Sequence, residues 1–394
     1  MAEQGIHNKV QLALEASEFD AILATGADNV QYLSGAAPPF LPYRPDQRLI
    51  VFWPKKGEPV LLCPPDLEST ARRLGGTETV QTYSPTGEDP AGLAAAVARL
   101  AGTLEQQPPT LGIDTQQTPY ALYEALAVAL PGARLIAGDD WLRELRMVKT
   151  VPEQALLEEI AYTTDHGLNG SLHHVAVESP RTRLTESEQI RIHCLERGLE
   201  ETGYHSAALV AGGPAARTLW PLDPRHGFNH GFGSTGKLQP GQMVRMNMRA
   251  TRDGYWSDAC RILVTGQPTA EQAAAYQSLV ALREAMTASI RPGVPCSSVY
   301  HGAVTAAESE GIDLVSQLGL GHGVGVAVEE SPYLAADDDT LLEEGMVLVL
   351  APVVRGPDDE LLCSKDTVII TGEGCRIVGW WKDWREPYIP IPII

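Results

Sequence analysis

The chain contains 394 residues, of which 44% are hydrophobic and 20% charged, a composition typical of folded globular proteins and unlike that of disordered or collagen-like chains. Its 50 acidic residues outnumber its 30 basic ones, and the formal charge of −20 argues against nucleic acid as a partner. No apolar run approaches the roughly 20 residues of a membrane span, and the first residues lack the basic-then-apolar order of a signal peptide. Six scattered cysteines without a CxxC pattern indicate reduced thiols. We therefore expect a cytoplasmic protein with no membrane partner.

Short apolar runs alternate with helical patterns in the first part of the chain. Phe19–Ala24, Leu49–Trp53 and Pro59–Cys63 are bounded by Gly, Pro or charged residues, which is typical of buried strands. Pro90–Gly102 carries Ala and Leu at helical spacing. Strands that alternate with helices predict a layered α/β domain over residues 1–148.

A second domain is expected over residues 149–394. Pro152 suits the first turn of a helix, and the apolar residues after it, from Leu157 to Leu172, recur on one helical face. The other elements expected here are helices at Ile190–Leu199, Ala273–Ile290 and Ser297–Glu310, and strands at Met243–Met248, Arg261–Val264, Met346–Leu350 and Thr367–Ile370. Thr269 with Gln272 matches a capping box ahead of the second of these helices. Together they predict helices packed on a mainly antiparallel sheet.

Polar residues that could carry chemistry gather in four segments of the second domain. These segments are Asn229–Arg261 with His230, Asn247 and Asp258, then Gly319–Glu330 with His322, Glu329 and Glu330, then Glu344–Pro352, and finally Cys363–Asp366 with Lys365.

The order of these motifs resembles that of a known family. Gly-Tyr-x-Ser-Asp-x-x-Arg at Gly254–Arg261, Gly-His-Gly-x-Gly at Gly321–Gly325 and Gly-Met-Val-x-x-x-x-Pro at Gly345–Pro352 together resemble the pita-bread family of prolidase, Xaa-Pro aminopeptidase, methionine aminopeptidase and creatinase. Asn29–Gly35 resembles the N-terminal domain of the prolidase and creatinase branch. The resemblance implies an α/β (α+β) protein: an N-terminal creatinase-like α/β domain and a C-terminal pita-bread domain, whose antiparallel sheet is covered by helices.

The family's peptidases hold two divalent metals with Asp, Asp, His, Glu and Glu. The resemblance places Asp258 and His322 at two of these positions and Asn247, Ala351 and Lys365 at the other three. Two dications need several anionic oxygens, and Lys365 would place a cation where a metal should sit. We therefore expect no metal ligands and no cofactor, with a single weakly held ion as an open alternative.

Creatinase, which also resembles this chain in having Asn at the first ligand position, implies hydrolysis of a C–N bond without metal. The resemblance makes His230 the acid/base at the family's proton-shuttle position. We predict His230, His322 and Asp258 as catalytic residues. The predicted substrate-binding residues are Asn247, Lys365, Glu330, Arg44 and Tyr43.

The resemblance also implies a homodimer in which one subunit's N-terminal domain covers the other's pocket. Tyr43 and Arg44 lie in a Pro-rich segment, at the place where creatinase has an Arg that holds the substrate. Arg44 could bind a substrate carboxylate through two hydrogen bonds, and Arg48 is an alternative candidate for this role. The aromatic tail Trp380–Tyr388 is expected to pack in the core or the dimer, or to form a wall of the pocket.

Our leading hypothesis is a metal-independent, creatinase-like hydrolase of a C–N bond in a small molecule. A metal-dependent Xaa-Pro dipeptidase or aminopeptidase is the second hypothesis, and a non-catalytic member of the family that binds a peptide or protein is the third. Two local alternatives also stay open. Asp258 would have a structural role if it pairs with Arg261 or Lys365, and Cys260 is an alternative nucleophile.

Overall fold

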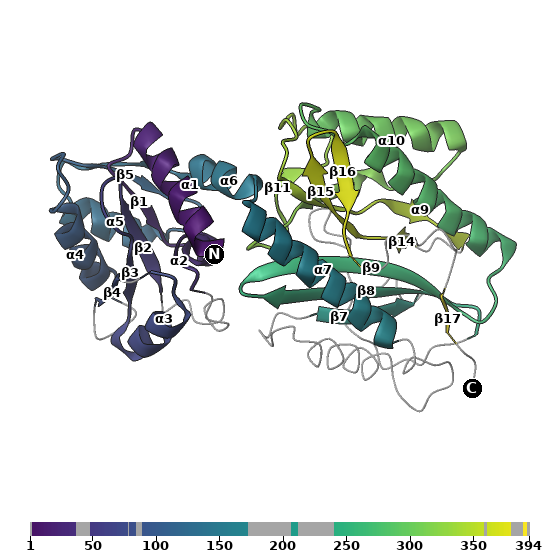
Figure 1. Cartoon of the computed structure of the whole chain (residues 1–394), viewed down its shortest axis with the longest axis horizontal. Helices are drawn as coiled ribbons and strands as arrows, with labels where there is room; N and C mark the ends of the chain where they lie inside the picture. The colour runs from purple at the N-terminus through teal and green to yellow at the C-terminus, as the bar shows by residue number, and fades with distance from the viewer. Residues whose placement is uncertain are drawn as a thin grey trace. The chain divides into compact units, whose positions relative to one another are not determined.

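The structure, a computed structural model, describes residues 2–36, 48–77, 79–83, 89–171, 206–211, 240–357, 361–379 and 389–391 (Figure 1). The chain divides into two compact units, one formed by Met1–Arg146 with Thr150–Pro152 and the other by Met147–Lys149 with Glu153–Ile394. The predicted boundary between residues 148 and 149 falls within residues 147–152, where short stretches of the chain belong alternately to the two units.

The first unit is built on a mixed sheet whose described strands follow the order β4-β3-β2-β1-β5-β6. The strands are β1 (Ala21–Ala24), β2 (Ile50–Pro54), β3 (Val60–Cys63), β4 (Thr79–Thr82), β5 (Thr110–Ile113) and β6 (Arg134–Ala137). The helices are α1 (Ala2–Ala16), α2 (Ala27–Ser34), α3 (Glu68–Leu74), α4 (Pro90–Ala101), α5 (Tyr120–Ala129) and α6 (Asp139–Met147), with a short 3₁₀ turn, η2 (Pro65–Leu67).

Burial explains why the apolar runs of this unit form strands. All four residues of β1 are buried, and so are those of β3 and β5, as expected for strands of a layered sheet that is covered by helices. The helix α4 begins at Pro90, directly after Asp89, whose side chain accepts a hydrogen bond from the Ala91 N–H. The three predicted strands and the predicted helix at Pro90 are therefore confirmed.

The second unit combines sheets whose described pairings are antiparallel, apart from β17 with β9. One sheet has the order β17-β9-β8-β7, a second has the order β11-β10-β12-β15-β16, and β13 pairs with β14. The strands are β7 (Ser206–Ala211), β8 (Met243–Arg252), β9 (Tyr255–Thr265), β10 (Gly321–Gly323), β11 (Glu330–Tyr333), β12 (Val347–Leu350), β13 (Val353–Arg355), β14 (Leu361–Cys363), β15 (Asp366–Thr371), β16 (Gly374–Ile377) and β17 (Ile389–Ile391). The helices are α7 (Val151–Ser171), α9 (Ala270–Ser289) and α10 (Cys296–Glu310), with a 3₁₀ turn, η4 (Ser316–Leu318).

The long β8–β9 hairpin has a two-residue turn. Arg252 pairs with Tyr255, so Asp253 and Gly254 form the loop, with φ values of 50° and 74°. Positive φ at both loop residues is the backbone conformation that matches the twist of a tight hairpin, and Asp-Gly is a favoured sequence for it. The helix α7 lies along this hairpin, where Thr164 and Ser257 share a hydrogen bond of 2.6 Å (Figure 1).

The described helices α9 and α10 lie within three residues of the predicted bounds, Ala273–Ile290 and Ser297–Glu310. Both hydrogen bonds of the Thr269–Gln272 capping box are present at the start of α9, and α10 ends at Gly311, whose φ is 65°. Apolar residues of these helices, among them Met286 and Val299, pack against β12 and β15 in one buried cluster. An α/β unit followed by helices on an antiparallel sheet confirms the predicted fold class.

The helix predicted at Ile190–Leu199 lies outside the described residues. Among the helices that the structure describes, none combines the length and the apolar character needed to cross a bilayer.

Candidate functional site

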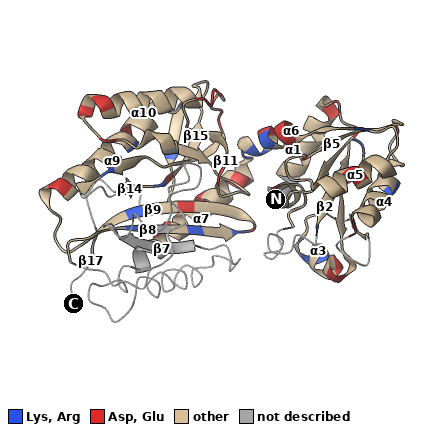
Figure 2. Ribbon diagram, turned by 180° about the vertical axis from the view of Figure 1, so that it is seen from behind, with Lys and Arg blue, Asp and Glu red and all other residues tan. Residues whose placement is uncertain are grey.

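Five charged or titratable side chains meet in the second unit, where the β8–β9 hairpin approaches the sheet that contains β10 and β15. Cys260 of β9 forms an isolated bridge with Lys365, which joins the two sheets at this point. Figure 2 shows acidic and basic positions side by side on the hairpin. We call the five residues the charged cluster; they are Arg249, Asp258, His322, Glu329 and Lys365.

Asp258 is the centre of the charged cluster. One of its carboxylate oxygens, Oδ2, lies 2.5 Å from Lys365 Nζ and 3.4 Å from Arg249 Nη2. Burial alone would raise the pKa of the Asp258 carboxyl, but the positive charges of Lys365 and Arg249 outweigh burial and lower it. Asp258 is therefore an ionised carboxylate, and the structural alternative of a pair with Lys365 is realised.

His322 is held as a neutral imidazole. Its Nδ1 lies 3.0 Å from the Gly323 carbonyl oxygen, which can only accept a hydrogen bond, so Nδ1 carries the proton and Nε2 is a bare acceptor. Burial lowers the pKa of His322, and the charge of Lys365 lowers it further against the opposing effects of Asp258 and Glu329. The closest Asp258 oxygen is 3.8 Å from Nε2, which is too far for a hydrogen bond.

Two buried acceptors of the cluster lack a hydrogen-bond donor among the described residues. They are Asp258 Oδ1 and His322 Nε2. Buried polar atoms in native proteins are almost always paired with protein, water or ligand. These two atoms are therefore the ones that a water molecule, a substrate N–H group or a cation would pair with.

Arg249 and Glu329 complete the cluster, although neither is among the predicted site residues. Arg249 Nη2 lies 2.5 Å from Glu329 Oε1, and Arg249 stands opposite Asp258 in the hairpin. The period-2 pattern of a strand could have identified Arg249, because it lies two residues beyond Asn247 and therefore on the same face of β8.

The glycines around His322 are required for close packing of the backbone. A methyl group at Gly321 would lie 2.4 Å from the Val349 carbonyl oxygen, and one at Gly323 would lie 2.4 Å from that of Ser331. The sequence motif therefore positions His322 by letting neighbouring strands approach. This explanation concerns the fold and requires no contact with substrate.

The other predicted site residues fall into two groups. Glu330 forms a separate buried ion pair with Lys149, with 2.8 Å between Oε1 and Nζ. The structure places Asn247 on β8 opposite Cys260, and its side chain is outside the described part. The remaining residues and the aromatic tail also lie outside the described residues; they are Tyr43, Arg44, His230 and Trp380–Tyr388.

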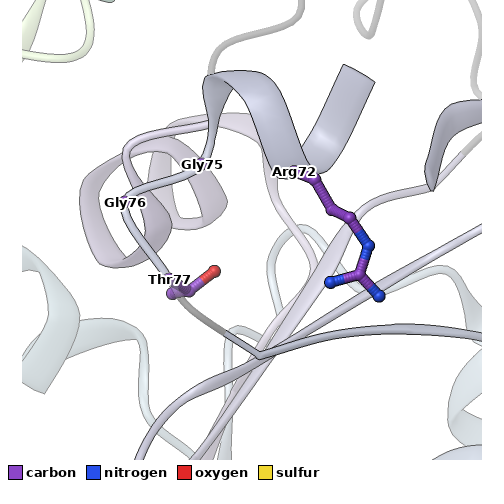
Figure 3. Close-up of a pocket in the computed structure, with 4 residues that line it drawn as sticks. All are labelled: Arg72, Gly75, Gly76 and Thr77. Carbon is purple, nitrogen blue, oxygen red and sulfur yellow. The ribbon is translucent and has the colours of Figure 1, made fainter. Parts of the chain in front are cut away.

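A surface pocket in the first unit is a poor alternative to this cluster. It has a volume of about 310 Å³ and is lined by Arg72, Gly75, Gly76 and Thr77 (Figure 3). Arg72 is already engaged, because its guanidinium donates to Glu68 Oε1 and to the Val80 carbonyl oxygen. None of the four lining residues is a general acid or base suited to neutral pH.

Comparison with known proteins supports the peptidase branch of the predicted family. The model of metallopeptidase family M24 matches residues 156–377, and the creatinase/prolidase N-terminal domain matches residues 7–148. A putative dipeptidase, YkvY of Bacillus subtilis, is 26% identical over 91% of this chain and 93% of its own length. An Xaa-Pro dipeptidase of Pyrococcus horikoshii is 24% identical over 92% of this chain and 93% of its own. The crystal structure of dipeptidase PepE from Mycobacterium ulcerans covers 100% of both chains with a TM-score of 0.77 and 23% identity.

These relatives correct the leading hypothesis from the sequence. The full-length relatives are named dipeptidases and Xaa-Pro dipeptidases, so the prediction of creatinase-like, metal-independent hydrolysis of a small molecule is wrong. The relatives agree with the second hypothesis, a peptidase. Creatinase was favoured because Asn247, Ala351 and Lys365 stand at three metal-ligand positions and because it shares the Asn, but the relatives that match along more than nine-tenths of the chain are named dipeptidases.

The family name implies metal, and the described residues do not fit a dinuclear centre. Asp258, His322 and Glu329 offer ligand atoms that all lie within 4.8 Å of one another. Both carboxylates, however, already contact cationic side chains, Lys365 or Arg249. The ammonium charge of Lys365 would repel a dication, and the two carboxylates, already paired with cations, leave too little negative charge for two such ions.

Proposed function

Because the chain belongs to metallopeptidase family M24, we propose that it hydrolyses the peptide bond of a short peptide with an Xaa-Pro sequence. The similarity to dipeptidases over more than nine-tenths of the chain supports this substrate class. The observation that carries the proposal is the pair of buried acceptors, Asp258 Oδ1 and His322 Nε2, which have no donor among the described residues.

The chemistry of the cluster suits this reaction in two ways. The bare Nε2 of a neutral His322 is a base that can take a proton from an attacking water or accept a hydrogen bond from the substrate. The positive charges of Lys365 and Arg249 beside Asp258 would stabilise negative charge on the carbonyl oxygen of the peptide bond. His230 stays a proposed acid/base that would protonate the leaving nitrogen.

The proposal includes an oligomeric state and a cellular location. We propose a homodimer in which Tyr43 and Arg44 of one subunit bind the substrate held by the other, and light scattering at micromolar concentration should give the mass of two chains. A cytoplasmic location is supported by the five described cysteines, which are all free thiols.

The test is a panel of dipeptides assayed by mass spectrometry of the released amino acids. The panel contains Xaa-Pro peptides, the reversed Pro-Xaa peptides and N-acetylated forms, each assayed with a chelator and with Mn²⁺ or Co²⁺ added. Cleavage of the Xaa-Pro peptides, abolished in His322→Ala, supports the proposal. A folded native protein that cleaves none of the peptides under any of these conditions would overturn it.

A further inference from the structure

We infer that the ammonium group of Lys365 takes the place of a divalent ion at Asp258, and that loss of its charge lets Asp258, His322 and Glu329 bind one such ion. The inference concerns the charges of the cluster and goes beyond the proposed peptidase activity. It is tested by metal binding without substrate, so failure of the peptide assay would leave it standing.

Lys365 is fixed in its position by contacts of its side chain and its backbone. Its side chain is 4% exposed, and Nζ contacts Asp258 Oδ2 at 2.5 Å. Its backbone is held on both sides, because its N–H donates to the Cys260 carbonyl oxygen at 3.1 Å and its carbonyl accepts from Arg261 Nη1. These backbone hydrogen bonds to β9 hold the Lys365 ammonium group beside Asp258.

Three side chains of the charged cluster bring possible metal-ligand atoms close together. Asp258 Oδ1 and His322 Nε2 are buried without a described donor, and Glu329 offers an oxygen within 4.8 Å of ligand atoms on both. The proton on His322 Nδ1 leaves Nε2 as the free lone pair that a metal needs. Two carboxylates and one imidazole form a set that suits Co²⁺, Mn²⁺ or Zn²⁺.

Negative and positive side chains are paired within the charged cluster. Asp258 and Glu329 contribute two carboxylates, and each is already in contact with a cationic side chain, Lys365 or Arg249. A dication added to this balanced cluster would leave an excess of positive charge in a buried place. Replacing Lys365 by a neutral side chain leaves one uncompensated carboxylate, which a divalent ion can neutralise.

The experiment compares full-length native protein with Lys365 variants after treatment with a chelator. Lys365→Met removes the charge at similar length, and Lys365→Arg keeps it. Lys149→Met is the matched control, because Lys149 is also a buried lysine in a carboxylate ion pair, at 2.8 Å from Glu330. Co²⁺ and Mn²⁺ are titrated separately by calorimetry, and the visible absorption of bound Co²⁺ reports its coordination.

The expected result is a new site for one ion per chain in Lys365→Met, with a dissociation constant at least about tenfold below that of the native chain. Adding His322→Ala should abolish the gain, and Lys365→Arg and Lys149→Met should bind as the native chain does. If Lys365→Met fails to fold, Lys365→Gln is used, because its amide keeps a donor for Asp258. Native protein that binds two ions per chain as tightly as the variants, or a neutral variant that gains nothing, would overturn the inference.

Discussion

Lys365 Nζ and Asp258 Oδ2 lie 2.5 Å apart, and the Asp258 side chain is completely buried. Asp258 lies on β9, and Lys365 lies between β14 and β15, directly before the first residue of β15. Their contact therefore joins the hairpin to the sheet that carries His322. A buried ion pair adds little net stability, but removal of one partner leaves the other as an unpaired buried charge.

The first prediction follows from this dependence. Asp258→Asn removes the carboxylate charge that contacts the buried ammonium of Lys365 at 2.5 Å, and we expect the free energy of unfolding to fall by roughly 3–5 kcal/mol. Chemical denaturation followed by circular dichroism measures the change. The control is Glu159→Gln, which breaks the more exposed pair with Arg252 and should cost less than about 1 kcal/mol. Equal losses in the two variants would contradict the prediction.

The second prediction concerns pH. The folded protein lowers the pKa of His322, whereas the unfolded chain protonates this residue near its ordinary value of about 6.5. Between the two values the unfolded state binds more protons, so the stability of the native protein decreases as the pH falls below about 6.5. His322→Gln cannot titrate, and its stability should depend less steeply on pH, by at most about 1.4 kcal/mol per pH unit. Urea denaturation between pH 7.5 and 5.5 measures the free energy of unfolding of the two proteins. An equal dependence on pH in both would show that titration of His322 does not contribute to stability.

The elements that the sequence predicted are those that local patterns define. Fully apolar runs such as Ala21–Ala24 and the capping box at Thr269 are read from neighbouring residues, and both are present. Cross-strand contacts are different, because they depend on register. The pairing of Arg249 with Asp258 becomes visible only once Asp253-Gly254 is recognised as a two-residue hairpin turn.

The sequence predicted only part of the candidate site, because the remaining residues are identified by the register of the strands. Asp258, His322 and Lys365 stand in recognisable motifs, and the structure brings them together. Glu330 belongs to the same motif as Glu329, yet it pairs with Lys149, whereas Glu329 contacts Arg249. Adjacent residues near a strand point in opposite directions, so the choice between the two glutamates requires the strand's register.

The third prediction tests the proposed chemistry. Loss of a general base typically costs about 10²–10⁴-fold in rate, so His322→Ala should lower kcat for Xaa-Pro cleavage by at least roughly 100-fold. His230→Ala should have an effect of similar size on kcat if it protonates the leaving nitrogen. Steady-state kinetics on the cleaved peptide measures both, with Glu159→Gln as the control. Near-native turnover in His322→Ala would remove it from the catalytic residues.

The fourth prediction concerns the glycines that position His322. Alanine at Gly323 would place its methyl carbon 2.4 Å from the Ser331 carbonyl oxygen and 2.8 Å from that of Glu330, so β10 and β11 would have to separate. We expect the free energy of unfolding to fall by roughly 1–3 kcal/mol, as for other overpacked sites. Gly302 is the matched control. It lies within α10, where the added methyl group would meet nothing within 4 Å beyond the helix's own backbone, and alanine there should stabilise the protein by up to about 1 kcal/mol. Because β10 carries His322, Gly323→Ala should also lower peptidase activity while Gly302→Ala leaves it unchanged. Thermal unfolding and peptide assays on both variants test this prediction. A change of stability of the same sign in the two variants would contradict the explanation that Gly323 is needed for close approach of the strands.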